Sequence, residues 1–266
     1  MYDFHYHRPK TLADAVGLLK GKDEARPMSG GMTLIPTLKQ RLAKPSDVVD
    51  LGGIKELAGI KIEGNNVVVG GMTRHADVAS SADVKGAIPA LAYLAGHIGD
   101  PQVRNRGTIG GSIANNDPNA DYPAACLGLG ATIITNKRRI AADDFFTGMF
   151  STALEDGEII TKISFPIAKK AAYEKFKHPA SGFALVGVFV SKRGSDIRVA
   201  VTGAGANGVF RVKSFEEALK KRFAAKSIEG MTIPATGMNS DIHASPEYRA
   251  HLVGVLARRA LAKANA

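Results

Sequence analysis

The sequence predicts an α+β protein, in which a mixed N-terminal part is followed by a part built on an antiparallel sheet. The chain has 266 residues, of which 45% are hydrophobic and 23% charged, so it can bury the core of one large or two modest domains. Helical and strand-like segments alternate up to about residue 165. From about residue 170 strand-like runs repeat, which indicates a second domain with an antiparallel sheet.

The first 53 residues predict a compact β/α unit. Apolar residues at positions 12, 15, 16 and 19 follow the helical period, with Thr11 as N-cap and Gly21 as the stop signal. A second helix is expected over residues 34–42, because Pro36 is tolerated only in a first turn. Residues 47–51 predict a strand. The paired glycines before residue 34 therefore lie at a helix entrance.

The next segments combine strands and helices around a long polar stretch. A turn at residues 64–66 leads into the β-branched run 67–69, and residues 131–135 and 159–165 also predict strands. Helices are expected over residues 88–98 and 122–129. Residues 99–121 are polar and rich in glycine, and we expect a loop there. A loop of this length inside a compact domain is more often functional than idle.

The C-terminal part predicts strands over residues 183–190, 197–202 and 209–212, and a final helix that Ser245 and Pro246 open. Residues 203–208 match the dinucleotide pattern G-x-G-x-x-G. The residues that follow are strand-like and do not open a helix, so a turn between strands is the better interpretation.

Two segments with paired glycines carry the strongest chemical signal, residues 29–33 and 108–112. Paired glycines let backbone N–H groups approach a ligand without a Cβ in the way, and the flanking hydroxyls add donors, which suits diphosphate oxygens. Neither segment is a Walker A motif, because no Lys-Ser/Thr follows at the required spacing.

The net charge of +10 raises the question of an anionic partner: nucleic acid, a membrane surface or a phosphorylated ligand. The basic runs at 137–139, 220–222 and 258–259 are short, and aromatic residues make up only 6% of the chain without any Trp. A base-stacking platform is therefore not evident, and a solvated face or a docking surface is the simpler account. The N-terminus lacks signal-peptide architecture, and no stretch approaches the roughly 18 apolar residues of a membrane span.

Metal-binding and nucleophilic patterns are absent. The single cysteine, Cys126, excludes a disulfide framework and cannot ligate an iron–sulfur cluster alone; in an apolar helix it is expected to be a buried structural thiol. The seven histidines form no metal-ligand spacing, and surface or packing roles are expected for His5 and His7. Asp117 and Asp121 follow the second glycine segment, and either cap the next helix or bind a ribose hydroxyl.

Taken together, these motifs resemble the FAD-binding medium subunit of molybdenum hydroxylases, the xanthine dehydrogenase family, and most of all its aerobic carbon monoxide dehydrogenase branch. The resemblance rests on residues 29–36, 104–112 and 117–123, and continues through 173–176 and 178–184, so it covers essentially the whole chain. It implies a PCMH-type FAD domain over residues 1–168, with subdomains of about 1–53 and 54–168, and a C-terminal α+β domain over 169–266.

The resemblance also implies the cofactor-binding residues. Two segments match those that grip the FAD diphosphate, Asp121 matches an acid in contact with the cofactor, and three further positions line the site. Met32 stands where many relatives have a polar residue, which leaves backbone groups and Thr33 to hold the phosphates. The residues are Ser29, Gly30, Gly31, Met32, Thr33, Leu34, Ile35, Pro36, Gly99, Thr108, Ile109, Gly110, Gly111, Ser112, Asp121, Ile160 and Leu185. Catalytic and metal-ligating residues are not expected in this chain.

The function that the resemblance implies is electron transfer. A small subunit with two [2Fe-2S] clusters and a large subunit with the molybdenum cofactor would pass electrons through the FAD of this chain to an external acceptor, in a dimer of heterotrimers. We expect a complex that is located in the cytoplasm and can also lie at the inner membrane surface. We expect no nucleic-acid partner. Two alternatives stay open: a basic module that binds nucleic acid or acidic proteins without redox activity, and a stand-alone flavin oxidase of the related fold.

Overall fold

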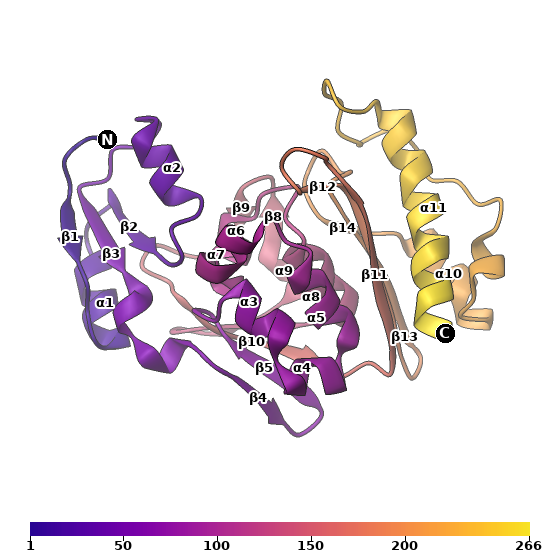
Figure 1. Cartoon of the computed structure of the whole chain (residues 1–266), viewed down its shortest axis with the longest axis horizontal. Coiled ribbons are helices and arrows are strands. Elements are labelled where there is room, and N and C mark those ends of the chain that lie inside the picture. Colours follow the sequence, from indigo (N-terminus) through magenta and orange to yellow (C-terminus); the bar gives the residue numbers. More distant parts are fainter.

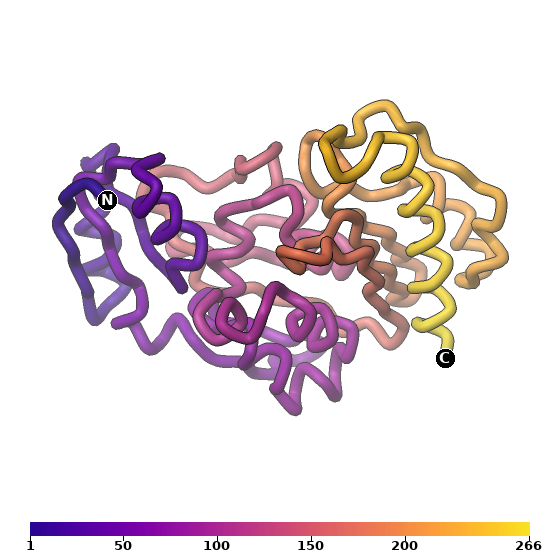
Figure 2. Tube along the Cα trace, turned by 45° about the horizontal axis from the view of Figure 1, so that its top comes forward, coloured from indigo at the N-terminus to yellow at the C-terminus, as the bar shows by residue number.

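The computed structural model describes residues 1–266. Three bodies follow one another along the chain and lie in a row, with the N-terminal unit at one end and the C-terminal helix at the other (Figures 1 and 2). The mixed α+β architecture predicted from the sequence is confirmed. No helix has the length and apolar character needed to cross a membrane.

The N-terminal unit is a three-stranded parallel sheet in the order β1-β3-β2, packed by α1. The predicted cap is present, since the Thr11 hydroxyl accepts a hydrogen bond from the Asp14 N–H at 3.1 Å. The second helix ends three residues earlier than predicted, because Arg41 has a φ of 59°, which a helix cannot accommodate. The elements are β1 (His5–His7), α1 (Leu12–Leu19), β2 (Ala25–Met28), α2 (Leu34–Lys39) and β3 (Asp47–Asp50).

The middle body is a five-stranded antiparallel sheet in the order β4-β5-β10-β6-β7, covered by helices. All eight residues of α8 are buried, Cys126 among them, as expected for a structural thiol. The elements are the 3₁₀ turns Leu51–Gly53 and Lys55–Leu57, β4 (Ile60–Glu63), β5 (Asn66–Gly70), α3 (His75–Ser80), α4 (Ala82–Ala87), α5 (Pro89–Gly96), α6 (Pro101–Arg106), α7 (Ile109–Asn115), α8 (Tyr122–Leu129), β6 (Thr132–Thr135), β7 (Arg139–Ala141), α9 (Ala142–Phe145), β8 (Phe146–Gly148), β9 (Ser151–Thr152) and β10 (Ile160–Pro166).

The polar stretch 99–121 is not the loop expected from its composition, because it contains two short helices. Asp100 caps α6 by accepting from the Val103 N–H at 2.8 Å, and a proline occupies its first position. Thr108 caps α7 in the same way through the Gly111 N–H at 3.2 Å. Local capping and packing of Ile109 and Ile113 in the core outweigh the weak helix propensity of the glycines.

The C-terminal body is an antiparallel sheet in the order β11-β12-β13-β14, with α10 and α11 on its outer face and α5 and α8 on its inner face (Figures 1 and 2). Residues 203–208 form the turn between β13 and β14, as the sequence indicated. Strand β11 and helix α10 were not predicted. The elements are β11 (Lys170–Lys177), β12 (Ala184–Arg193), β13 (Asp196–Thr202), β14 (Phe210–Arg211), α10 (Lys213–Lys221), a 3₁₀ turn (Ala225–Ile228) and α11 (Pro246–Asn265).

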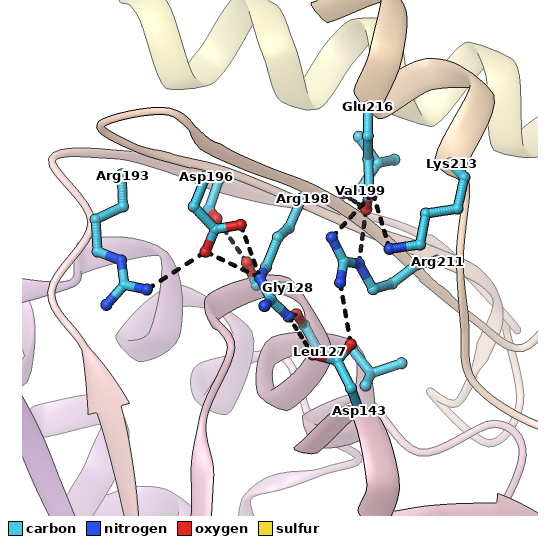
Figure 3. Close-up of polar contacts among 11 residues, drawn as sticks. Leu127, Gly128, Asp143, Arg193, Asp196, Arg198, Val199, Arg211, Lys213 and Glu216 are labelled. Carbon is cyan, nitrogen blue, oxygen red and sulfur yellow. Dashed lines mark hydrogen bonds and ion pairs between the residues drawn. The ribbon is translucent and has the colours of Figure 1, made fainter. Parts of the chain in front are cut away.

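The middle and C-terminal bodies are joined by a polar network as well as by a shared apolar core (Figure 3). Asp143 of α9 accepts hydrogen bonds from Arg198 at 2.8 Å and from Arg211 at 3.1 Å. Arg198 also donates to the carbonyl of Leu127 at the end of α8, and Arg211 forms a two-point pair with Glu216. Arg198 and Arg211 therefore bind the sheet of the C-terminal body to helices α8 and α9 of the middle body.

Candidate functional site

A cavity of about 660 Å³ lies between the N-terminal unit and the middle body. The loop from β2 to α2 lines it from the N-terminal unit, and α7 with the first residue of α3 lines it from the middle body. The beginning of β10 and Phe183, which precedes β12, also contribute to the lining. Its size and its mixture of apolar and polar groups are those of a cofactor site.

The loop from β2 to α2 presents a run of free backbone donors to this cavity. No group of the protein accepts a hydrogen bond from the N–H of Gly30, Gly31, Met32 or Thr33, and all four residues line the cavity. Gly31 has a φ of 75°, a left-handed backbone conformation that glycine adopts at little cost. A glycine loop with consecutive N–H groups free of protein acceptors suits the binding of an anion.

The glycines also allow two backbone segments to approach closely. A Cβ on Gly30 would lie 2.1 Å from the Arg106 carbonyl oxygen, and one on Gly110 would lie 2.6 Å from the Gly71 carbonyl oxygen. Contacts below 3.0 Å to backbone cannot be relieved without moving the chain. Gly30 and Gly110 are therefore required for the packing that creates the cavity.

The second glycine segment differs from the first in its hydrogen bonding. The N–H groups of Ile109 and Gly110 donate to the Thr73 and Gly71 carbonyls at 3.0 and 2.8 Å. The Gly111 N–H already meets the Thr108 hydroxyl. Because these donors are engaged, the segment contributes its hydroxyls and its close packing to the site, and not the free N–H groups that the sequence suggested.

Asp121 lines the cavity, and its side chain makes no capping hydrogen bond to α8, which excludes one of its two sequence interpretations. Its carboxylate accepts from the Tyr173 hydroxyl at 2.6 Å and from the Lys175 ammonium at 2.9 Å. The side chains of Lys175 and Asp121 are 6% and 1% exposed, so the ion pair is buried. Two residues of β11, in the C-terminal body, therefore hold Asp121 in place at the cavity.

His75 is a lining residue that sequence reasoning missed. It is 4% exposed, packs against the ring of Tyr122, and its Nδ1 has no hydrogen-bond partner. Burial, with a smaller effect of the Arg104 charge, lowers its pKa to about 4, so the imidazole is neutral at physiological pH. The sequence holds no signal for it, because its neighbours Gly107 and Tyr122 are more than 30 positions away.

The structure gathers most of the residues implied by the resemblance around the cavity, and leaves five outside its lining. Ile109 and Leu185 belong to two different apolar cores. Pro36 is exposed, Ile35 packs over Gly31, and Gly99 packs against the side chain of Val103. The residues that line the cavity are Ser29, Gly30, Gly31, Met32, Thr33, Leu34, Thr108, Gly110, Gly111, Ser112, Asp121 and Ile160. Lining residues that were missed include Arg26, Met72, His75, Asn115 and Phe183.

The free N–H groups of the glycine loop and the volume of the cavity both fit a flavin dinucleotide. Comparison with known families agrees: a family described as the FAD binding domain in molybdopterin dehydrogenase matches residues 2–168, and the CO dehydrogenase flavoprotein C-terminal domain matches residues 171–264. The protein is thus a flavoprotein subunit of an oxidoreductase.

Relatives extend the likeness over the whole chain. It is 36% identical to the carbon monoxide dehydrogenase medium chain of Hydrogenophaga pseudoflava, over 97% of this chain and 96% of that one. It is 35% identical to the glyceraldehyde dehydrogenase medium chain of Sulfolobus acidocaldarius, over 97% of both. A solved structure, the reconstituted CO dehydrogenase from Oligotropha carboxidovorans, superposes with a TM-score of 0.87 at 36% identity, over 99% of this chain and 98% of that one. The chain belongs to the family of FAD-binding medium subunits of molybdenum hydroxylases.

Proposed function

We propose that this chain is the electron-transfer subunit of a heterotrimeric molybdenum hydroxylase, with residues 1–168 as its FAD domain and 169–266 as its C-terminal domain. The observation that carries the proposal is the run of free N–H groups at residues 30–33 on a cavity of about 660 Å³. The FAD-domain family match over residues 2–168 supports it.

The residues of this chain hold and shield the cofactor. The N–H groups of residues 30–33 would receive the diphosphate, and the hydroxyls of Thr33 and Ser112 lie on the same cavity. Asp121, held by Lys175, would accept from a hydroxyl or N–H group of the cofactor. Bound FAD takes up and releases electrons singly or in pairs, which suits it to connect iron–sulfur clusters with a two-electron acceptor.

Substrate oxidation is assigned to a partner subunit. This chain has one cysteine, which is buried, so the [2Fe-2S] clusters require a small subunit and the molybdenum cofactor a large one. The medium chains of carbon monoxide and glyceraldehyde dehydrogenases match this chain at 36% and 35% identity. Such even likeness across two substrates supports a role in the shared electron transfer and not in substrate choice.

We further propose that the complex is a dimer of heterotrimers located in the cytoplasm. The assembled complex would also bring this chain to the inner membrane surface. A nucleic-acid-binding role is not favoured, since the cavity is built from glycines and hydroxyls while the basic runs lie elsewhere. A stand-alone oxidase would need acid–base residues free to act beside the flavin, and the Asp121 carboxylate is already engaged by Tyr173 and Lys175.

The test is purification of the chain, alone and together with its partner subunits. We expect one FAD per chain, seen as a yellow protein whose absorbance bleaches on reduction, and co-purification with subunits that contain iron–sulfur and molybdenum. A colourless chain that binds no added FAD would overturn the proposal.

A further inference from the structure

A second cavity, of about 600 Å³, lies on the C-terminal body and is hereafter called the basic groove. It opens where the ends of α10 and α11 meet the beginning of β11, at the end of the molecule opposite to the N-terminal unit (Figure 1). It shares no residue with the FAD-binding cavity. Its lining is Lys170, Lys192, Lys221, Arg222, Phe223, Ala224, Ala225, Leu261, Ala262 and Asn265, with no acidic residue.

The positive charges of the basic groove are not neutralised by the protein. Next to Lys192 in the sequence, Arg193 pairs with Asp196, and next to Lys221, Lys220 pairs with Glu217. Lys192, Lys221 and Arg222 have no such partner, and Lys170 donates to a neutral acceptor, Asn265 Oδ1, at 2.7 Å. In the basic run 220–222, Lys220 is therefore paired with an acid, whereas Lys221 and Arg222 line the groove.

Two of these charges also lie directly opposite each other. Lys170 of β11 and Lys192 of β12 are register partners in the antiparallel pair. Like charges in directly opposite positions destabilise a sheet, and the negative end of the α10 dipole offsets only the charges in its own last turn. An anion in the groove would relieve this repulsion.

We propose that the basic groove binds an acidic, carboxylate-bearing peptide segment of a partner protein. Five of its ten lining residues are apolar, and Ala224, Ala225 and Ala262 among them are partly or fully exposed, which suits the side chains of a peptide better than a hydrated inorganic ion. Its concave form does not suit a flat anionic membrane, and it has no exposed aromatic ring on which a base could stack.

The test uses the full chain and a fluorescein-labelled hexaglutamate peptide, followed by fluorescence anisotropy at low and high salt. The variant is Lys192→Glu with Lys221→Glu. The matched control is Lys55→Glu with Lys85→Glu, which makes the same change of net charge at exposed, unpaired lysines of the middle body. The milder pair Lys192→Gln with Lys221→Gln serves if charge reversal impairs folding, which the circular dichroism spectrum and FAD content report.

We expect the groove variant to bind the peptide about tenfold more weakly, and the control to bind it nearly as well as the wild type, with affinity falling as salt rises. Equal losses in both variants would overturn the proposal, because the peptide would then respond to net charge alone. Displacement of the peptide by equimolar inorganic phosphate would also overturn it, in favour of a small-anion site. Because FAD content is measured separately, these outcomes are independent of the proposed electron-transfer function.

Discussion

The hydroxyl oxygens of Ser29 and Thr108 lie 2.5 Å apart, in a hydrogen bond that joins the two glycine segments beside the cavity. The two residues are 79 positions apart in the sequence and belong to different bodies of the fold. This bond, with the close packing of Gly30 on the Arg106 carbonyl, holds the loop of free N–H groups against α7.

Ser29→Ala and Thr108→Val, made singly and together, are expected to be coupled. Removing either hydroxyl removes this bond, while Ser29 keeps its contact with the Met72 sulfur and Thr108 keeps the Gly111 N–H. Each change should therefore lower the free energy of unfolding by about 1 kcal/mol, with a somewhat larger effect for Thr108 because it also caps α7. The double-mutant cycle, measured by denaturant unfolding, should give a coupling of about 0.5–1.5 kcal/mol. Additive effects would show that the hydroxyls act independently.

Gly30→Ala should destabilise the protein and lower its FAD content, because the new Cβ would lie 2.1 Å from the Arg106 carbonyl oxygen. We expect a loss of about 1–3 kcal/mol, as in other overpacked sites. Gly17→Ala is the matched control: it lies in α1 with no atom within 4 Å of the added Cβ, and should stabilise the protein by roughly 0.5–1 kcal/mol. Unchanged FAD content in Gly30→Ala would contradict the role of this close contact.

Lys175→Met should be among the most destabilising single changes, since it leaves the Asp121 carboxylate buried without its ion-pair partner. The expected loss is about 3–5 kcal/mol. The double variant Asp121→Asn with Lys175→Met, which buries no charge, should lose less than Lys175→Met alone. Thermal unfolding of the three variants measures this, and a double variant less stable than Lys175→Met would refute it.

His75 should make the protein less stable in acid. The unfolded chain takes up a proton near the ordinary pKa of 6.5, whereas the folded protein keeps the imidazole neutral until about 4. The unfolded state therefore binds more protons between these values, and the free energy of unfolding falls as the pH falls through this window, by about 3 kcal/mol in full. In His75→Phe this part of the pH dependence should vanish. Parallel pH profiles for the two proteins would exclude the assignment.

Local signals predicted much of this fold, and long-range contacts account for what was missed. Thr11, Ser245 and Pro246 act on residues next to them in the sequence, so the first residues of α1 and α11 could be predicted. The partners of Asp121 come from β11, and the packing of His75 depends on α6 and α8, so neither could be read from adjacent residues. The hydrogen bonds of the N–H groups of residues 109 and 110 could not be predicted either, because their acceptors are the carbonyls of Thr73 and Gly71.

The central claim is that the backbone of residues 30–33, and not that of residues 109–111, receives the diphosphate. Amide hydrogen exchange of the FAD-loaded and FAD-depleted chain tests it most directly, since only unbonded N–H groups exchange freely. We predict that FAD strongly slows exchange in the peptide covering residues 29–34, whereas residues 109–111, whose N–H groups already have acceptors, change little. Equal exchange of residues 29–34 with and without FAD would contradict the account.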